Sequence, residues 1–324
     1  MRVLDGKRSA AAGLVAWLVL LLGTTADSPS TELIHKIVLF AVLVVVPLGL
    51  SLVPPPPDRN TTFWLYNVAV ALRPAAAILT VISFFLEKGV AAAALASALL
   101  IVYIVIALYG VTRLLSRGSI FSLAESSIDA GLLYLPVAGA WLVVYRLGIQ
   151  PFGYGEIIIL LTVVHFHFAG FAAPIIAGMN GRVLALNDYP QQLFGFSVFA
   201  IVAAMPLVAA GITLTPVLGL FGTILLSIGL ILLAVLTIGW VRPAITQTAN
   251  QVLLVLAALS SCSAMVLASL YAYSLATHTL ILTIPMMAMT HGILNAFGFV
   301  TSSLFVWSQI APKELITHKR AQLL

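Results

Sequence analysis

The sequence predicts an all-α integral membrane protein, a polytopic bundle of about ten transmembrane helices. Hydrophobic residues make up 62% of its 324 positions and charged residues only 8%, whereas a soluble domain has about 25% charged residues. The mean hydropathy is +1.15. The apolar runs are about 20 residues long, the length of helix that crosses about 30 Å of hydrocarbon. We therefore expect a single integral membrane domain over residues 1–324, placed in the cell membrane and surrounded by lipid.

Ten apolar runs, separated by polar or Gly/Pro-rich breaks, predict the spans in chain order. The expected spans are residues 9–25, 37–53, 63–86, 89–110, 128–149, 155–178, 192–212, 216–239, 251–274 and 281–308. The first run follows basic residues, as the apolar run of a signal peptide does. Its long apolar core and the nine later spans nevertheless favour a retained helix. The segment 148–155 and Pro243 punctuate the chain after the fifth and eighth spans.

The Lys and Arg residues predict the orientation, because cytoplasmic loops carry an excess of them. With the N-terminus inside, three of them (Lys36, Lys88 and Arg146) fall in outer loops or helix ends. Eleven fall in cytoplasmic segments: Arg2, Lys7, Arg8, Arg59, Arg113, Arg117, Arg182, Arg242, Lys313, Lys319 and Arg320. Both termini are therefore predicted to be cytoplasmic. The basic residues are too dispersed for a nucleic-acid-binding surface, so no nucleic-acid partner is expected.

The ten spans would divide at the segment 148–155 into halves of five, residues 1–149 and 150–324. Halves with an odd number of spans face opposite ways, which is the geometry of many transporters. One weak sequence repeat is present: a histidine followed by a Gly-Phe pair occurs in the sixth span and again in the tenth.

Two histidines, His165 and His167, lie in the middle of the sixth span, where ionisable groups are costly and mark candidate functional sites. Side chains two residues apart point about 200° from each other on a regular helix. The pair therefore cannot hold one metal ion unless the helix is distorted, which Gly170 and Pro174 would permit. The alternative is that each histidine donates a hydrogen bond to a backbone carbonyl inside the bundle.

Arg73 lies near the middle of the third span and is followed by Pro74. It is permanently charged, and no carboxylate lies at the same predicted depth. We expect a ligand anion or a counter-charge beside it, in preference to snorkelling, because the nearer helix end is about ten residues away.

The tenth span carries a polar stripe. His291, Asn295, Gly298 and Ser302 follow one another at helical spacing and share one face, which should look toward protein or water. The alternative is a hydrogen-bonded seam between two helices, since glycines allow close helix approach.

Glu125 and Asp129 share a face at the cytoplasmic start of the fifth span. They either complement the helix dipole in the usual way or form a carboxylate pair at a cytoplasmic mouth, able to accept protons or to partner Arg73. His35 and His278 fall at predicted outer helix ends, where a solvated or interfacial role is expected.

Missing motifs narrow the function. The sequence contains no P-loop, no GxSxG elbow, no HExxH and no CxxC. The single Cys262 excludes an intrachain disulfide. The assignment as an enzyme therefore stays open and leans toward no, and ATP-driven transport by this chain alone is not expected.

Two short motifs carry family resemblances. The segments His165-Phe-His-Phe-Ala-Gly-Phe171 and Thr290-His-Gly-Ile-Leu-Asn-Ala-Phe-Gly-Phe299, spread over ten apolar spans, resemble the YndJ-like family of bacterial membrane proteins. That family is largely uncharacterised and is often labelled as transporters, which implies a class without a substrate. The His-Phe-His stretch is also locally similar to haem–copper oxidase subunit I, in which two such histidines serve different haems. The other histidines of that oxidase are missing, so oxidase activity is not carried over.

Three functions follow, in order of preference. The first is a permease for a small, anionic solute, coupled to protons through intramembrane histidines, since the ordinary pKa of histidine lies near neutrality. In this hypothesis Arg73, His165, His167, His291, Asn295, Glu125 and Asp129 bind solute or relay protons, and no cofactor is needed. The second is a membrane-embedded haem- or metal-binding protein or enzyme with His165, His167 and His291 as ligands. The third is a non-catalytic scaffold or subunit, in a homo-oligomer or a larger membrane complex.

Overall fold

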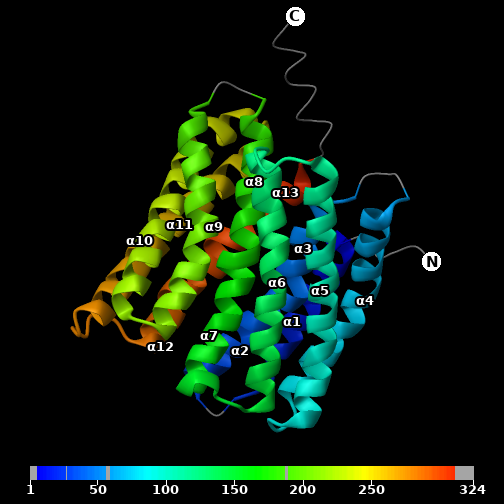
Figure 1. Cartoon of the computed structure of the whole chain (residues 1–324), viewed down its shortest axis with the longest axis vertical. Coiled ribbons are helices and arrows are strands. Elements are labelled where there is room, and N and C mark those ends of the chain that lie inside the picture. The colour runs from blue at the N-terminus through cyan, green and yellow to red at the C-terminus, as the bar shows by residue number, and fades with distance from the viewer. Residues whose placement is uncertain (1–5, 27, 56–58, 187–188, 311–324) are drawn as a thin grey trace, which may run out of the picture. The chain divides into compact units, whose positions relative to one another are not determined.

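The structure is a computed structural model that describes residues 6–26, 28–55, 59–186 and 189–310, and within these ranges the chain forms helices and no strand (Figure 1). It divides into two compact units. Unit 1 holds the chain up to Phe121 together with Asp129–Ala172, and unit 2 holds Ser122–Ile128 and the chain from Ala173 onward. The units join inside two continuous helical spans, and the predicted halves 1–149 and 150–324 stay a prediction.

Unit 1 is built from long helices with one strongly interrupted span. Its helices are α1 Gly6–Leu20, α2 Pro29–Phe40, η1 Ala41–Val45, α3 Val46–Ser51, α4 Thr61–Phe84, α5 Val90–Arg117, α6 Leu123–Leu147 (from Asp129 onward), η2 Pro151–Gly153, α7 Glu156–His165 and η3 Phe166–Ala172. Helices α4 and α5 pack along each other as a hairpin, and α1 packs on η1 and α3.

Unit 2 begins with the first turn of α6 and continues from the end of η3. Its helices are α8 Ala173–Leu184, α9 Gln191–Thr213, α10 Pro216–Leu236, η4 Thr237–Val241, η5 Arg242–Ala244, α11 Thr248–Ala276, α12 Ile284–Met287, η6 Ala288–Gly292, η7 Leu294–Thr301 and α13 Ser302–Gln309. Helix α10 packs on both α9 and α11, and α11 also packs on η7.

The predicted membrane class is confirmed: in the described part of the chain, nine helices are long and apolar enough to cross a membrane. The helix ends differ from the prediction in several places. Helix α1 ends at Leu20 and the next span already begins at Pro29, whereas 9–25 and 37–53 were expected. The termini themselves lie outside the described residues, so their cytoplasmic placement stays a prediction.

Several helix ends have an identifiable cap. Asn60 precedes α4, and its side chain accepts a hydrogen bond from the backbone N–H of Phe63. Thr215 caps α10 in the same way, with Pro216 at the first helical position. Gly118 ends α5 with a φ of 67°, the left-handed conformation that glycine adopts without strain. Helix α5 therefore continues past residue 110, the predicted end, and carries Arg113 and Arg117 on a helix.

Three π-helical segments of the described chain share a local cause. Segments η1, η3 and η4 each end two residues before a proline, namely Pro47, Pro174 and Pro243. A proline has no backbone N–H, and its ring collides with the carbonyl four residues earlier. Widening the preceding turn relieves that collision, and such π-bulges concentrate at functional sites. Segment η3 contains His167, so the distortion falls beside the histidine pair.

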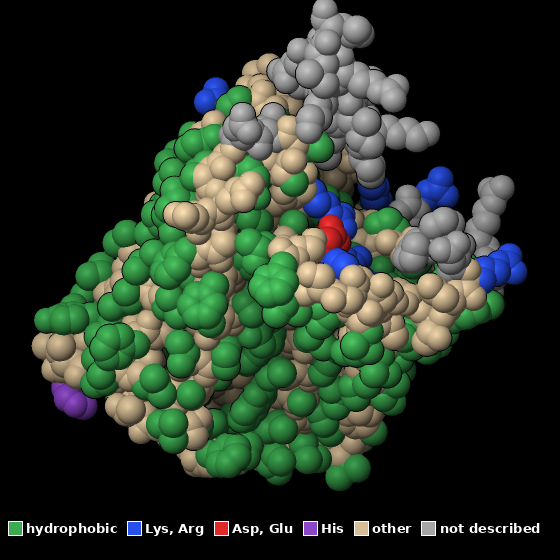
Figure 2. Space-filling view, turned by 45° about the horizontal axis from the view of Figure 1, so that its top comes forward, with side chains coloured by type: hydrophobic (Ala, Val, Ile, Leu, Met, Phe, Trp, Pro, Cys, Tyr) green, Lys and Arg blue, Asp and Glu red, His purple; other side chains and the backbone are tan. Residues whose placement is uncertain are grey.

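Large hydrophobic side chains cover the outer surface, as expected of a protein whose surroundings are lipid (Figure 2). Lys and Arg side chains gather near one end of the visible face, around a carboxylate. Such an apolar surface suits contact with lipid hydrocarbon, which cannot hydrogen-bond to polar groups.

We expect Gly178→Ala to lower the free energy of unfolding by about 1–3 kcal/mol. A Cβ at Gly178 would lie 2.6 Å from the carbonyl oxygen of Ala124 and would overlap the side chain of Ile128, both on the first turn of α6. Reversible unfolding in mixed detergent and SDS measures the change. Gly239→Ala is the control, because a Cβ there meets no atom within 4 Å. Equal costs for the two variants would contradict the prediction.

Candidate functional site

Arg73 is a buried charge near the middle of a membrane-spanning helix of unit 1. It lies in the middle of α4 and is only 2% exposed. One guanidinium nitrogen, Nη2, donates a 2.7 Å hydrogen bond to Oγ of Ser9 on α1, and Nε has no hydrogen-bond partner. Among the described residues, no carboxylate forms an ion pair with it. The guanidinium also interacts electrostatically with the phenol of Tyr103 on α5.

His167 is buried next to the same phenol. Its Nδ1 lies 2.8 Å from the carbonyl oxygen of Val163, and its Nε2 lies 2.8 Å from the hydroxyl of Tyr103. A carbonyl can only accept, so Nδ1 carries a proton, and in the neutral imidazole Nε2 accepts from the hydroxyl of Tyr103. Tyr103 and His167 thus form a hydrogen-bonded pair in the interior of unit 1.

His165 has a different environment. Its Nδ1 lies 2.7 Å from the carbonyl oxygen of Leu161, the same backward bond that His167 makes, and its side chain is part-buried. Both histidines thus adopt the carbonyl-bonded alternative through Nδ1, and the helix is distorted from residue 166 onward. Within the described residues, no group of three or more His, Cys, Asp or Glu side chains could hold a metal ion.

The two predicted carboxylates have separate partners. Asp129, in unit 1, forms ion pairs with Arg113 at 2.8 Å and with Arg117 at 2.7 Å, and its side chain is 2% exposed. Glu125, in the part of α6 that belongs to unit 2, binds both Nε and Nη2 of Arg182 at 2.6 and 2.9 Å. Asp129 therefore neutralises arginines of α5 and forms no ion pair with Arg73.

The polar stripe of the last span packs against α11 in unit 2. Nδ1 of His291 lies 2.8 Å from the carbonyl oxygen of Ala264, and the amide of Asn295 lies within 3.3 Å of the His291 ring. A Cβ at Gly298 would overlap the side chain of Ser260. These contacts form the helix–helix seam that was the alternative interpretation of the stripe.

Sequence reasoning missed the burial of three residues of unit 1. His35 and Lys36 lie inside α2, and Arg146 lies in the last turn of α6, a helix end as expected. Their exposed fractions are 2%, 5% and 2%. His35 lies between the hydroxyls of Tyr145, 2.6 Å from Nε2, and Thr25, 3.0 Å from Nδ1. The expected solvated role of His35 is therefore wrong, whereas His278 is exposed just after α11, as expected.

The sequence patterns that could have linked these residues to their partners differ from residue to residue. Glu32, His35 and Lys36 share one face of α2 at spacings of three and four, which sequence alone could have linked, and Lys36 forms a 2.6 Å ion pair with Glu32. Thr25 extends this group by donating to Glu32 at 2.9 Å. Tyr103, by contrast, is one of two tyrosines in the apolar run of α5, and nothing in the sequence connects it with His167.

Tyr103→Phe should lower the free energy of unfolding by about 1–3 kcal/mol, because it leaves Nε2 of the buried His167 without a donor. The same substitution in a His167→Leu background should cost less than 1 kcal/mol, since no acceptor is then stranded. A double-mutant cycle of SDS-induced unfolding measures both values. Additive costs would show that the two side chains do not interact.

Comparison with known proteins places these residues in a family. A family model described as YndJ-like protein matches residues 36–299, which include Arg73, both histidine motifs and the Asp129 ion pairs. The chain is 28% identical over 298 residues, 91% of its length, to the "Uncharacterized membrane protein YndJ" of Bacillus subtilis (strain 168). The match covers 52% of that relative, so the chain spans about half its length. No solved structure matches. The chain therefore belongs to the YndJ-like family, and the resemblance of its two histidine motifs to that family is confirmed.

Proposed function

We propose that this protein is a membrane permease for a small anionic solute and that Arg73 in unit 1 binds the anionic group. The chain is a multi-pass membrane protein, since its relative is a membrane protein and its helices have membrane-spanning length. Transport and the anionic substrate are the proposal, and one observation carries them.

That observation is the buried guanidinium of Arg73, which forms no ion pair with any carboxylate in the described part of the chain. An arginine at the centre of a membrane helix costs at least about 2.5–3.5 kcal/mol, even on the scale that gives the lowest values. One hydrogen bond to a charged group contributes about 1.5–3 kcal/mol, so the hydroxyl of Ser9 offsets at most the insertion cost. Nε remains without a partner. A carboxylate or phosphate would supply both the charge and the acceptors, because a guanidinium binds such groups through two parallel hydrogen bonds.

Buried polar side chains at other depths of unit 1 support a path to this group. Asp129 with its two arginines lies where α5 ends, and Tyr103 and His167 lie at mid-span. Tyr145 lies near the C-terminal end of α6, and its partner His35 lies inside α2. Polar groups inside a membrane bundle typically mark substrate or proton pathways. The neutral imidazole of His167, one hydrogen bond from Tyr103, is the proton carrier of the proposal.

Uptake into proteoliposomes tests the proposal. Purified wild-type protein is reconstituted, and the uptake of radiolabelled chloride, acetate, phosphate and citrate is measured with an inward proton gradient and without one. We expect uptake of at least one anion above that of protein-free liposomes, with a loss of at least tenfold in Arg73→Gln. Ser97→Ala, an exposed substitution on α5, serves as a reconstitution control. Absence of uptake for all four anions, or equal uptake by Arg73→Gln, would refute the assignment.

A further inference from the structure

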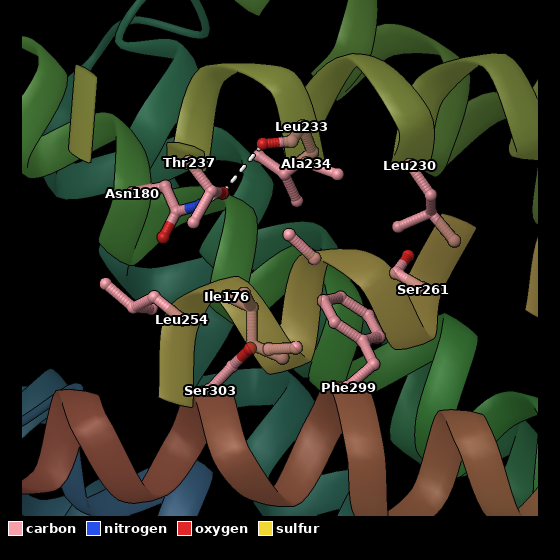
Figure 3. A pocket seen from close by; sticks show the side chains of 12 residues that line it. Ile176, Asn180, Leu230, Leu233, Ala234, Thr237, Leu254, Ser261, Phe299 and Ser303 are labelled. Carbon is pink, nitrogen blue, oxygen red and sulfur yellow. Dashed lines mark hydrogen bonds between the residues drawn. The ribbon is translucent and has the colours of Figure 1, made fainter. Parts of the chain in front are cut away.

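Helices α10 and α11 of unit 2 differ on their two sides. On the inner side they enclose, together with α8 and the junction of η7 with α13, a cavity of only about 10 Å³, whose wall includes Leu230 and Ser261 (Figure 3). On the outer side the same two helices form a groove of about 370 Å³, a volume in the range of small-ligand sites. The two helices are therefore closely packed on the inner side and leave a hollow on the outer side.

Two serines explain why the groove exists. Ser227 on α10 and Ser269 on α11 both line it, and their hydroxyl oxygens are 3.0 Å apart. The positions around them carry larger apolar side chains, among them Ile224, Ile231 and Val266. Two small side chains that meet between larger ones leave the hollow along the seam of the two helices.

The hydroxyl groups of the groove are satisfied within the protein. Ser227 donates to the carbonyl oxygen of Thr223 at 2.8 Å. Because that proton is used, Ser269 donates its own to Oγ of Ser227. Among the described residues, no charged side chain lines the groove. The groove therefore suits an apolar occupant and has no need of a polar one.

The groove extends over one half of the membrane span. Its lining residues on α10 run from Leu220 to Ile231, which is about 17 Å of helix at 1.5 Å per residue. They belong to the span Pro216–Ala244, so the groove ends near the middle of that span. On α11 the lining residues lie in the second half of the span and end at Tyr273. Half of the hydrocarbon core is about 15 Å thick, so the groove covers the depth of one leaflet.

We propose that this groove binds one acyl chain of a membrane lipid. The terminal methyl group of the chain lies near Ile231 and Met265, and the ester end lies near Tyr273. A hydrocarbon chain forms no hydrogen bonds, so it leaves those of the two serines intact. Tyrosine is enriched where a membrane meets water, because its ring is apolar and its hydroxyl is polar. Tyr273 is 51% exposed and stands at the end of the groove where the lipid head group begins.

The sides of the groove favour a lipid chain over a second copy of the protein. Transmembrane helices associate through small residues, which let their backbones approach closely. The sides of this groove are instead bulky and exposed: Ile224 is 41% exposed, Val266 55% and Leu270 41%. These side chains hold a helix backbone away from the two serines, whereas a single hydrocarbon chain is narrow enough to lie between them.

Photo-crosslinking in lipid nanodiscs tests the site. The probe is phosphatidylethanolamine with a diazirine at the terminal carbon of one acyl chain, and mass spectrometry locates the label. We expect at least five times more label at Ile231 and Met265 than at Leu72, an exposed residue in the middle of α4. Ser269→Phe fills the groove and should lower its label at least fivefold. Ser97→Phe, the same substitution on α5, should leave the label in the groove unchanged.

A titration of the wild-type protein in detergent requires no variant to fold. As the probe is added, label in the groove should saturate at one probe per protein, whereas label at Leu72 should keep rising. Equal label at both places, or label that a folded Ser269→Phe variant does not lower, would overturn the proposal in favour of general lipid contact. An unlabelled groove, with disulfide-linked dimers of Val266→Cys in a Cys262→Ala background, would overturn it in favour of a second copy.

Discussion

Replacement of Asp129 by Asn is expected to lower the free energy of unfolding by about 3–5 kcal/mol, the largest effect on stability that the structure predicts. Asp129 is the common partner of Arg113 and Arg117, whose side chains are 11% and 20% exposed. The substitution keeps the shape of the side chain and removes its charge, so two half-buried guanidinium groups lose their counter-ion. Removing one partner of a buried ion pair costs this much because the remaining charge stays desolvated.

Glu156→Gln is the control for this prediction. Its pair with Lys88 has a similar N–O distance, 2.6 Å, but the side chains are 49% and 29% exposed. Exposed ion pairs contribute about 0–1 kcal/mol, so this variant should unfold almost as the wild type does. SDS-induced unfolding measures both. Adding Arg113→Met to Asp129→Asn should recover part of the loss. A cost below 1 kcal/mol for Asp129→Asn would show that both arginines reach water unaided.

The same ion pairs explain why helix ends were harder to predict than membrane spans. A helix needs about 20 apolar residues to cross the hydrocarbon core, so the spans could be located from hydropathy alone. The prediction ended the fourth span at residue 110, because arginines were assumed to lie in water. In the structure Asp129 neutralises Arg113 and Arg117, and α5 continues to Gly118. A charge paired across two helices does not end a span.

His35 shows the same limit at longer range. Its partner Tyr145 is 110 residues away in sequence, and no spacing rule connects the two. The hydrogen bond between Tyr103 and His167 joins residues 64 apart and was equally invisible. The free-energy cost of placing an ionisable side chain in a membrane identifies which side chains need partners, as it did for Arg73 and His167. It does not identify the partners, which depend on how the helices pack.

The π-helical segments could be predicted from the sequence only in part. The sequence indicated a local bend near Gly170 and Pro174, and the structure has η3 there. The recurrence of the pattern before Pro47 and Pro243 is local, so a rule on prolines inside apolar runs would have found it. Helices α4, α6 and α9 contain prolines without a π-helical segment, so proline alone is not sufficient.

Arg73→Met should separate function from stability. If Arg73 binds the solute anion, its loss removes at least two charge-assisted hydrogen bonds, and the Kd of the transported anion should rise at least 100-fold. The free energy of unfolding should stay unchanged or rise, because the variant removes a buried cation that has no ion-pair partner among the described residues and loses the hydrogen bond to Ser9. Functional residues commonly carry such a stability cost.

Arg73→Lys sharpens this separation, because it keeps the charge and loses the planar fork. We expect the affinity of this variant for the anion to lie between the affinities of wild type and Arg73→Met, since an ammonium group binds a carboxylate or phosphate as a point charge. Thermal unfolding with increasing anion measures binding: a ligand at 100 times its wild-type Kd stabilises the wild type by about 2.7 kcal/mol, and Arg73→Met by about 0.4 kcal/mol or less. If Arg73→Met unfolds more easily than wild type without any anion, the guanidinium is instead a structural tie between α4 and α1. Its buried charge would then be satisfied by the protein, and the case for an anionic solute would fall with it.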